Sequence, residues 1–464
     1  MKLFIHICLA ALLFINCSDE KIDDGRDLTE NEKVNTYIKE KINEPTSIYL
    51  WTEEVAGKSY SLTAEPDIYL SHLIYEEDQW SHVERDASLG RAEVYENDDI
   101  ETGFGYYLLY YRTSDGFILA KVAYVYPDSP ADKAGLKRGD LITKINDNDI
   151  TQDNMQDLLY ADKVKISLSK LEGNSILPPY TTLSLTAANT QIDPVLTTSI
   201  IDLNGTKIGY MLYTRFVYSG DKDLEHLNEV FREFKRQGVT EFILDLRYNP
   251  GGYEVAAIRL ASLLAPASAL NNQEILLRKQ WNKYWQSQYE QRPENNLISR
   301  LDNTVPQNAR LDNLNRLWVI TSNNTASSSE VVINGLKPFY NDKLQQVGST
   351  TYGKYVGGVT QIPEDEEIND WRLTLITCTD VNSKGESVKG GLNPDHAASE
   401  DLADAHPFGD TSEGMLATTL GLIQGKNTLG MSSRSIATFT PLQVNRNIYP
   451  MLILPEAKVT DVAR

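Results

Sequence analysis

Cysteine and histidine are scarce in this chain. Three cysteines (Cys8, Cys17 and Cys378) and six scattered histidines occur among its 464 residues. No Cys/His cluster has zinc spacing, so the sequence predicts no metal site, and no intrachain disulfide is expected. Cys378 lies in the apolar run WRLTLITC, which is typical of a packed small residue rather than a reactive thiol.

Basic residues are also in the minority. The chain has 44 Lys and Arg against 65 Asp and Glu, a formal net charge of −21. This balance argues against nucleic acid as a partner and indicates an acidic, soluble surface. A composition that is 41% hydrophobic and 23% charged is typical of globular proteins. The length suggests two to four domains.

The chain has no apolar stretch of full transmembrane length, its start included. Lys2 precedes an apolar run over residues 3–15, which is too short for a good span, and Cys17 follows closely. This pattern resembles a bacterial lipoprotein signal, whose cysteine is lipidated; an ordinary cleaved signal peptide is the alternative. We therefore expect a signal peptide over 1–16, a lipid on Cys17 and a tether over 17–30. Such a protein is exported and anchored to the cell envelope, with the outer membrane as the expected site.

Residues 31–102 are expected to form a small helical N-terminal domain. In NEKVNTYIKEKI, Val34, Ile38 and Ile42 recur at a spacing of four. The segments YLWTEEV and IYLSHLIY, which follow, are also expected to be helical.

Residues 103–188 change to aromatic and β-branched strands, as in GFGYYLLYYR and FILAKVAYVY. With SPADKAGLKRGDLITKIN, this segment resembles a PDZ domain. PDZ domains bind a C-terminal peptide as an added strand and hold its carboxylate on backbone N–H groups. By position, the carboxylate loop would be formed by Gly103, Phe104, Gly105 and Tyr106. The alternative is that this turn merely joins two strands.

Strands and helices alternate over residues 189–425. This alternation predicts a layered α/β core with some parallel pairing. We assign residues 426–464, with the strand-like IYPMLIL, to a C-terminal extension of that core.

The stretch TSNNTASSSEVVIN, residues 321–334, gathers hydroxyl side chains where a predicted strand meets a predicted helix. The first N–H groups of a helix are unpaired and favour a developing negative charge, so this is a suitable place for a nucleophile. A capping box offers an alternative: Ser327 would be the N-cap and Glu330 the residue at N3.

A serine nucleophile needs a base and an oxyanion site. Lys354 in GSTTYGKYVGG is one candidate base, provided that burial lowers its pKa. His396 in GLNPDHAASE is another, as part of a Ser/His/Asp triad. The segment DLRYNPGG, residues 245–252, ends a buried strand, and its N–H groups could complete an oxyanion hole or form an ordinary turn.

In this order and behind a PDZ-like segment, DLRYNPGG, TASSSE and YGK resemble the motifs of the carboxyl-terminal processing peptidases, or tail-specific proteases. These are relatives of the tricorn protease core. GGLNPDHAASEDLADAHPFGD is similar to the segment before the last helix of that family, and YLWTEEV and DQWS resemble the N-terminal domain of Bacteroidetes members. The resemblance covers about residues 31–425. It implies a multidomain α/β (α+β) protein with a ClpP/crotonase-like peptidase core.

The resemblance also implies roles for individual residues. The family's nucleophile is the serine three residues before the glutamate, which is Ser327 here, and its base is the lysine of the GK loop, here Lys354. The oxyanion donors would be the backbone N–H groups of Ser328 and of Gly251 or Gly252.

One departure concerns the residue that orients the base. Many members place a glutamine four residues after the lysine, where this chain has Gly358; Gln361 is the nearest substitute.

The resemblance implies a serine endopeptidase that acts near protein C-termini on peptide or protein substrates, without a cofactor. A noncatalytic envelope binding or scaffold protein is the alternative.

Overall fold

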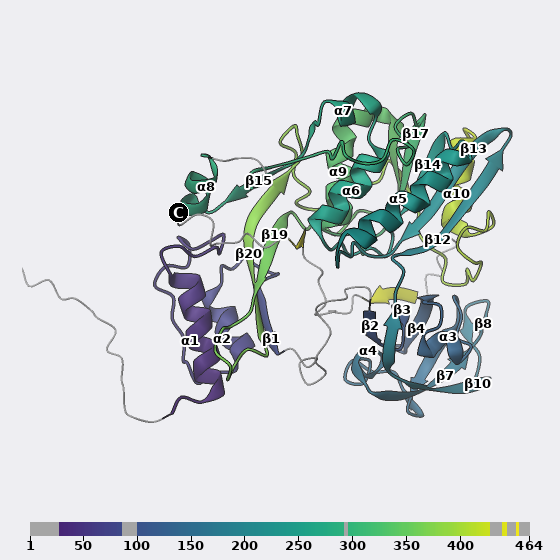
Figure 1. Ribbon diagram of the computed structural model, residues 1–464. Helices are drawn as coiled ribbons and strands as arrows, with labels where there is room; N and C mark the ends of the chain where they lie inside the picture. The colour runs from purple at the N-terminus through teal and green to yellow at the C-terminus, as the bar shows by residue number, and fades with distance from the viewer. Residues whose placement is uncertain (1–26, 86–99, 292–295, 427–438, 443–451, 454–464) are drawn as a thin grey trace, which may run out of the picture.

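The computed structural model describes residues 27–85, 100–291, 296–426, 439–442 and 452–453, and these form three lobes (Figure 1). One holds the N-terminal helices, one the strands of the PDZ-like segment, and the largest the alternating strands and helices. The expected signal peptide and Cys17 lie outside the described residues. No helix in those described ranges is both long enough and apolar enough to cross a membrane.

The central sheet of the largest lobe is mostly parallel. Its strand order is β12-β13-β14-β17-β18-β21, and every pair from β13 to β21 is parallel, while β12 and β13 form an antiparallel hairpin. The strands are β12 (Val195–Leu203), β13 (Thr206–Tyr213), β14 (Glu241–Asp245), β17 (Arg316–Thr321), β18 (Leu344–Gly348) and β21 (His396–Ala397).

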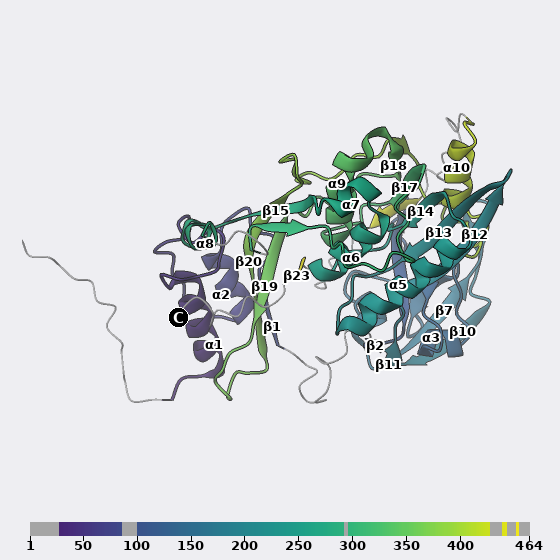
Figure 2. The same cartoon turned by 45° about the horizontal axis from the view of Figure 1, so that its top comes forward.

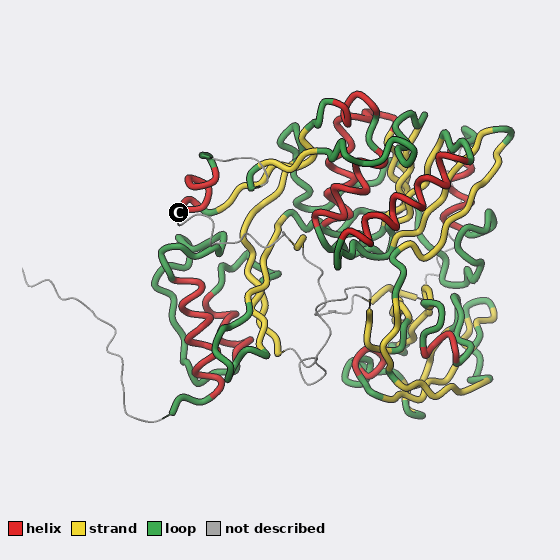
Figure 3. Tube along the Cα trace, viewed as in Figure 1, coloured by secondary structure: helices red, strands yellow, loops and turns green. Residues whose placement is uncertain are grey.

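Helices cover both faces of this sheet, as the red segments of Figure 3 show. Helices α5 (Asp221–Arg236), α6 (Glu254–Leu264) and α9 (Ser328–Tyr340) pack on one face, and α10 (Gly414–Ile423) packs on the other. Phe231 of α5 and Phe242 of β14 are fully buried in the larger of the two cores. The layered α/β fold with parallel pairing, predicted from the alternation of elements, is confirmed.

A second sheet links this lobe to the N-terminal one. Its order is β16-β15-β20-β19-β23, and β1 pairs with β20 off that path. Its strands are β1 (His82–Arg85), β15 (Ile275–Trp281), β16 (Ile298–Arg300), β19 (Val356–Gln361), β20 (Trp371–Val381) and β23 (Leu452–Ile453). Figure 2 shows β23 beside β19. The smaller helices α7 (Ala267–Asn271) and α8 (Lys283–Tyr289), and the 3₁₀ turn η2 (Asn341–Lys343), lie in the connections.

The N-terminal lobe is less helical than expected. Helices α1 (Glu30–Asn43) and α2 (Pro66–Leu73) form, but YLWTEEV, residues 49–55, adopts turns. Its backbone is used by other elements, because Leu50 N–H donates to Ile376 of β20 and Asn282 donates to the carbonyl of Tyr49. These contacts outcompete a short helix.

The PDZ-like segment forms a separate antiparallel sheet with the order β10-β7-β5-β4-β3-β22; β6 pairs with β5 off that path. It comprises β3 (Tyr106–Thr113), β4 (Ile118–Val125), β5 (Leu141–Ile145), β6 (Asn148–Asp149), β7 (Lys163–Ser169), β10 (Thr181–Thr186) and β22 (Phe439–Leu442), with α3 (Pro130–Lys133) and α4 (Asp157–Tyr160). The strands β2 (Ile100–Gly103), before β3 in the chain, and β11 (Ala188–Gln191), after β10, pair with each other in a two-stranded antiparallel sheet. The strands β8 (Leu171–Glu172) and β9 (Ser175–Ile176) form a small hairpin.

Residues 426–464 are assigned from the sequence to an extension of the core, but the described part of this segment does not only extend the core. Residues 439–442 form β22, which joins the PDZ sheet, and β23 pairs with β19. Neither pairing follows from local sequence pattern, because both partners are distant in the chain.

Candidate active site

The three segments singled out in the sequence meet at one edge of the central sheet. Residues 246–252 follow β14, residues 322–327 follow β17, and residues 349–355 follow β18. These three strands are neighbours and run parallel. The carboxyl ends of parallel strands lie at one edge of a sheet, where ligand sites of α/β proteins are usually built.

The hydroxyl run is tied to the segment 246–252. Thr325 Oγ1 donates to Leu246 O at 2.8 Å, Ser328 Oγ to Gly252 O at 2.6 Å and Ser329 Oγ to Asn249 O at 2.9 Å, and Ser322 Oγ donates to Arg247 O. These four hydroxyl groups therefore hold two loops together and are engaged as donors.

Ser327 is the exception. Its Oγ is buried and has no hydrogen-bond partner among the residues that the structure describes. Its backbone adopts φ 55° and ψ −118°, a region that is unfavourable for a residue with a side chain. Such strain costs on the order of 1–3 kcal/mol and persists where the surroundings impose it, often at active sites.

The capping-box alternative is met only in half. Ser327 and Glu330 face each other as in that motif, and Ser327 N–H donates to Glu330 Oε2 at 2.9 Å. Ser327 forms no side-chain cap hydrogen bond in return. The Ser327 hydroxyl is therefore not used to cap the helix, which is consistent with the nucleophile hypothesis.

Glu330 joins the serine turn to the lysine loop. Its carboxylate is fully buried and accepts hydrogen bonds from the N–H groups of Ser327, Gly353 and Lys354 and from the hydroxyl of Thr351. Burial raises the pKa of Glu330 to about 7, although these four donors lower it. One carboxylate thus fixes both loops relative to each other.

Lys354 is buried near the end of the loop that leads into β19, with 2% of its surface exposed. Burial lowers the pKa of Lys354 to about 7, and the negative charges of Glu330 and Asp78 partly oppose this shift. Because Asp78 belongs to the N-terminal lobe, that lobe also contributes to the electrostatics of the lysine. An amine with this pKa is partly neutral at pH 7, as a general base must be.

The glycines of DLRYNPGG let their loop approach the serine turn closely. A Cβ on Gly251 would lie 2.7 Å from Ser327 Cβ and 3.0 Å from Ser328 N, and Gly251 has φ 110°. Its own N–H donates to Asn249 Oδ1 at 2.9 Å. Of the two glycines implied as oxyanion donors, Gly251 thus has its N–H engaged within its own loop, which favours Gly252. Ser328 opens α9, so its N–H is one of those that a helix leaves unpaired.

A cavity of about 690 Å³ runs between the PDZ-like lobe and this edge of the sheet. Lys354 and Ala326 line it on the side of the core, and the residues of the predicted carboxylate loop, Gly103 to Tyr106, line it on the side of the PDZ lobe. Gly105 has φ 74°, and a Cβ there would lie 2.2 Å from Ser129 Cβ, so the loop packs tightly on α3. The cavity is long enough to connect the loop and the lysine with one continuous space.

Two of the predicted site residues lie away from this constellation. Gln361 ends β19, roughly 16 Å along the strand from Val356 at 3.3 Å per residue, and it does not line the cavity. His396 hydrogen-bonds to Gln345 Oε1 at 2.9 Å, while its neighbour Asp395 accepts from the N–H of Gln346. The substitution of Gln361 for the family glutamine and the His396 triad are therefore not supported by the geometry.

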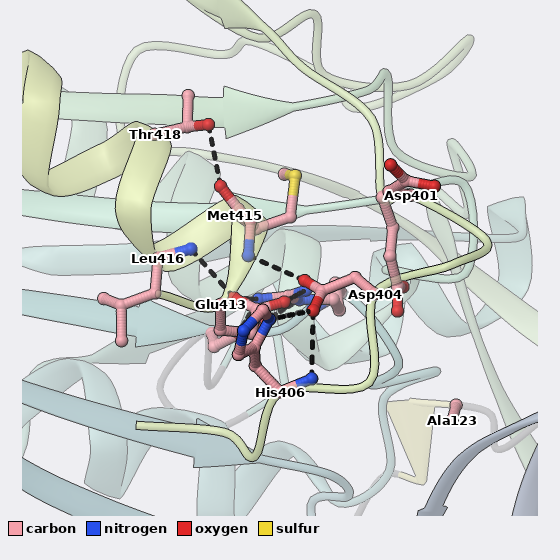
Figure 4. Close-up of polar contacts among 12 residues, drawn as sticks. Ala123, Asp401, Asp404, His406, Glu413, Met415, Leu416 and Thr418 are labelled. Atoms are coloured by element: carbon pink, nitrogen blue, oxygen red, sulfur yellow. Dashed lines mark hydrogen bonds and ion pairs between the residues drawn. The ribbon is translucent and has the colours of Figure 1, made fainter. Parts of the chain in front are cut away.

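A buried ionic network joins the PDZ lobe to the site, and the sequence analysis missed it. Arg138 of the PDZ lobe pairs with Glu400 at 2.9 Å and with Glu413 at 3.1 Å, and Arg247 pairs with Glu413 at 2.7 Å. Figure 4 shows Glu413 at the start of α10, where it accepts a hydrogen bond from the N–H of Leu416. Arg247 belongs to DLRYNPGG, so its position in that motif was the available signal.

No group of three His, Cys, Asp or Glu side chains within the described ranges is arranged to hold a metal ion. The groups that this site offers for chemistry are a strained, buried serine, a lysine that is partly neutral at pH 7, and backbone N–H groups at a helix start.

Comparison with known proteins gives consistent matches. Residues 207–398 match the model of peptidase family S41, and residues 121–163 match that of the PDZ domain. The carboxy-terminal-processing protease of Bartonella bacilliformis is 26% identical over 338 residues, 70% of this chain and 68% of that protein. The carboxyl-terminal-processing protease of Synechocystis sp. is 24% identical over 314 residues, 66% of each chain.

A crystal structure from Bacteroides fragilis, of a protein assigned to the S41 proteases, superposes on this chain with a TM-score of 0.67 and 26% identity. The superposition covers 86% of this chain and 98% of the Bacteroides fragilis chain.

Proposed function

Because this chain belongs to the carboxyl-terminal processing serine peptidases of family S41, we propose that it captures protein C-termini and cleaves them with a Ser327/Lys354 dyad. The observation that carries the dyad is that Glu330 joins the loops of two buried groups: a serine hydroxyl with no hydrogen bond among the described residues, and a lysine whose pKa burial lowers to about 7.

The proposed mechanism uses these two side chains and the neighbouring backbone N–H groups. Neutral Lys354 takes the proton of Ser327 Oγ as that oxygen attacks a peptide carbonyl. The oxyanion is bound by Ser328 N–H at the start of α9, with Gly252 N–H as the second donor. The protonated Lys354 then gives its proton to the leaving amine, and water hydrolyses the acyl-enzyme.

The PDZ lobe supplies the substrate in this proposal. A tail with its carboxylate at the loop Gly103–Tyr106 would extend through the cavity, whose far end is lined by Lys354. Binding through backbone hydrogen bonds suits an unstructured tail of varied sequence.

Cleavage of an unfolded protein substrate tests the dyad. The wild type should cleave, Ser327→Ala and Lys354→Ala should not, and His396→Ala should retain activity because His396 is bonded to Gln345. If Ser327→Ala cleaves like the wild type, the nucleophile is another residue. If the wild type binds tails but cleaves nothing, the noncatalytic binding role replaces the peptidase role.

We further propose that the protein is exported and anchored to the cell envelope through a lipid on Cys17, with the outer membrane as its site. The support is the short apolar run that precedes this cysteine. Mass spectrometry of the mature N-terminus should find a lipid-modified Cys17, and Cys17→Ala should release the protein from membranes. An unmodified N-terminus at another residue would refute the anchor.

A further inference from the structure

The edge of β3 is the place where a PDZ sheet accepts a peptide. β3 (Tyr106–Thr113) begins directly after the loop Gly103–Tyr106, and β4 occupies its other side. An added peptide lies antiparallel to such a strand, with its carboxylate towards the loop.

In this chain the edge is already partly occupied. β22 pairs antiparallel with β3, with Phe439 opposite Thr113 and Leu442 opposite Tyr110. The segment therefore runs towards the loop, which is the polarity of a bound C-terminal tail. It appears as the yellow strand between the PDZ lobe and the core in Figure 1.

Side chains anchor β22 as well as its backbone. Leu442 packs on the apolar core of the PDZ lobe, and Phe439 packs on the cluster of Leu119, Leu141 and Leu402. Pro441 has no N–H to offer a further strand, which suits a segment that closes an edge. Pro441 and Leu442 also line the cavity that reaches Lys354.

From this geometry we infer that residues 439–442 are an intramolecular ligand of the PDZ edge, which a protein tail must displace in order to bind. The inference rests on the proposed capture of tails by this lobe. A tail with its carboxylate at Gly105 has only Tyr106–Leu109 to pair with before it reaches Tyr110, which is already paired with Leu442, the last residue of β22. A peptide longer than about four residues therefore competes with β22 for the same backbone groups.

The competition is intramolecular, so it sets a threshold for binding. If the closed state holds about nine-tenths of the molecules, the apparent Kd of a tail is raised roughly tenfold over its intrinsic value. Tails that bind weakly would be excluded, and the cavity would open to those that bind well.

A disulfide lock tests this inference directly. Thr440 and Arg112 are opposite each other, and Cα atoms of antiparallel partners lie about 4.5–5.5 Å apart, within the range of a disulfide. The full chain with Thr440→Cys, Arg112→Cys and Ser327→Ala should form the bond on mild oxidation. Its affinity for a labelled ten-residue peptide with four apolar C-terminal residues and a free carboxylate should then fall at least tenfold, and reduction should restore it.

A releasing variant gives the opposite expectation. Leu442→Asp in the Ser327→Ala background should tighten binding of the same peptide roughly tenfold, whereas Ile362→Asp, at an exposed isoleucine on the second sheet's connection, should leave it unchanged. The inference is overturned if the disulfide does not form, if the oxidised form binds as well as the reduced one, or if Leu442→Asp binds no more tightly. Because Ser327→Ala does not cleave, a failure of the proposed catalysis would appear separately, as normal peptide binding without cleavage by the wild type.

Discussion

The backbone N–H groups of Ser327 and Lys354 donate to the same atom, Glu330 Oε2, at 2.9 Å each. The serine turn and the lysine loop follow different strands, so this shared acceptor fixes the distance between them. Glu330 is a positioning residue in this arrangement, since its carboxylate accepts hydrogen bonds from backbone N–H groups of both loops. The geometry of the proposed dyad thus depends on a residue that sequence analysis read as half of a helix cap.

Glu330→Gln should reduce both stability and turnover. A glutamine keeps the size of the side chain but presents one acceptor oxygen and an NH₂ group to the donors at Ser327, Gly353 and Lys354. Unsatisfied buried donors cost about 1–3 kcal/mol each, so the free energy of unfolding in urea should fall by roughly 2–4 kcal/mol. The matched control is Glu290→Gln at an exposed site; equal effects of the two changes would contradict the positioning role.

Activity should rise with pH through neutrality. Burial lowers the pKa of Lys354 to about 7, so the amine is charged and inactive as a base below that value and neutral above it. We expect kcat/KM to increase about tenfold per pH unit below pH 7 and to level off above pH 8. The contribution of Lys354 to stability should instead rise with pH between about 7 and 10.5, because in this window the unfolded lysine binds a proton that the folded one has released.

Lys354→Arg separates charge from proton transfer. A guanidinium remains protonated throughout this range, so the variant should be inactive from pH 6 to 9. A flat pH profile in the wild type, or activity in the arginine variant, would rule out Lys354 as the base.

The sequence was sufficient for the layers of the core and for the three loops, because alternating strand and helix patterns place each loop at a strand's carboxyl end. The resemblance implied Ser327 as the nucleophile, but local pattern alone could not distinguish it from the other hydroxyls of TASSSE. That choice depends on carbonyls of residues 246–252, which pairing of β14 with β17 brings to Thr325, Ser328 and Ser329.

Two other features depended on pairings that no local pattern reveals. Gln361 looked close to Lys354 in the sequence, but the extended conformation of β19 carries it away from the site. The pairing of β22 with β3 joins residues more than 300 positions apart, so the sequence did not predict that residues 439–442 belong to the PDZ sheet.

Gly251→Ala should abolish most activity through steric intrusion. A methyl group there would lie 2.7 Å from Ser327 Cβ and 3.0 Å from Ser328 N, so it would displace the nucleophile and the proposed oxyanion donor. Loss of one oxyanion donor costs about 10²–10³ in kcat, and we expect at least that loss here. Gly385→Ala is the control, because Gly385 also has a positive φ, +82°, but nothing within 4 Å of the added carbon. Similar kinetics for both variants would mean that backbone strain, rather than the filled space, is responsible.

Arg138→Ala should weaken the joint between the PDZ lobe and the core. The arginine side chain is 8% exposed between Glu400, which is 12% exposed, and the fully buried Glu413, so its removal leaves two largely buried carboxylates with less compensating charge. Breaking one partner of a buried pair costs about 3–5 kcal/mol, and we expect about 3 kcal/mol because Lys121 and Arg247 remain beside these carboxylates. Urea unfolding measures this value. Lys165→Ala, which breaks an exposed pair of 2.8 Å with Asp147, should cost less than about 1 kcal/mol. If the two substitutions cost the same, the network does not hold the lobes together.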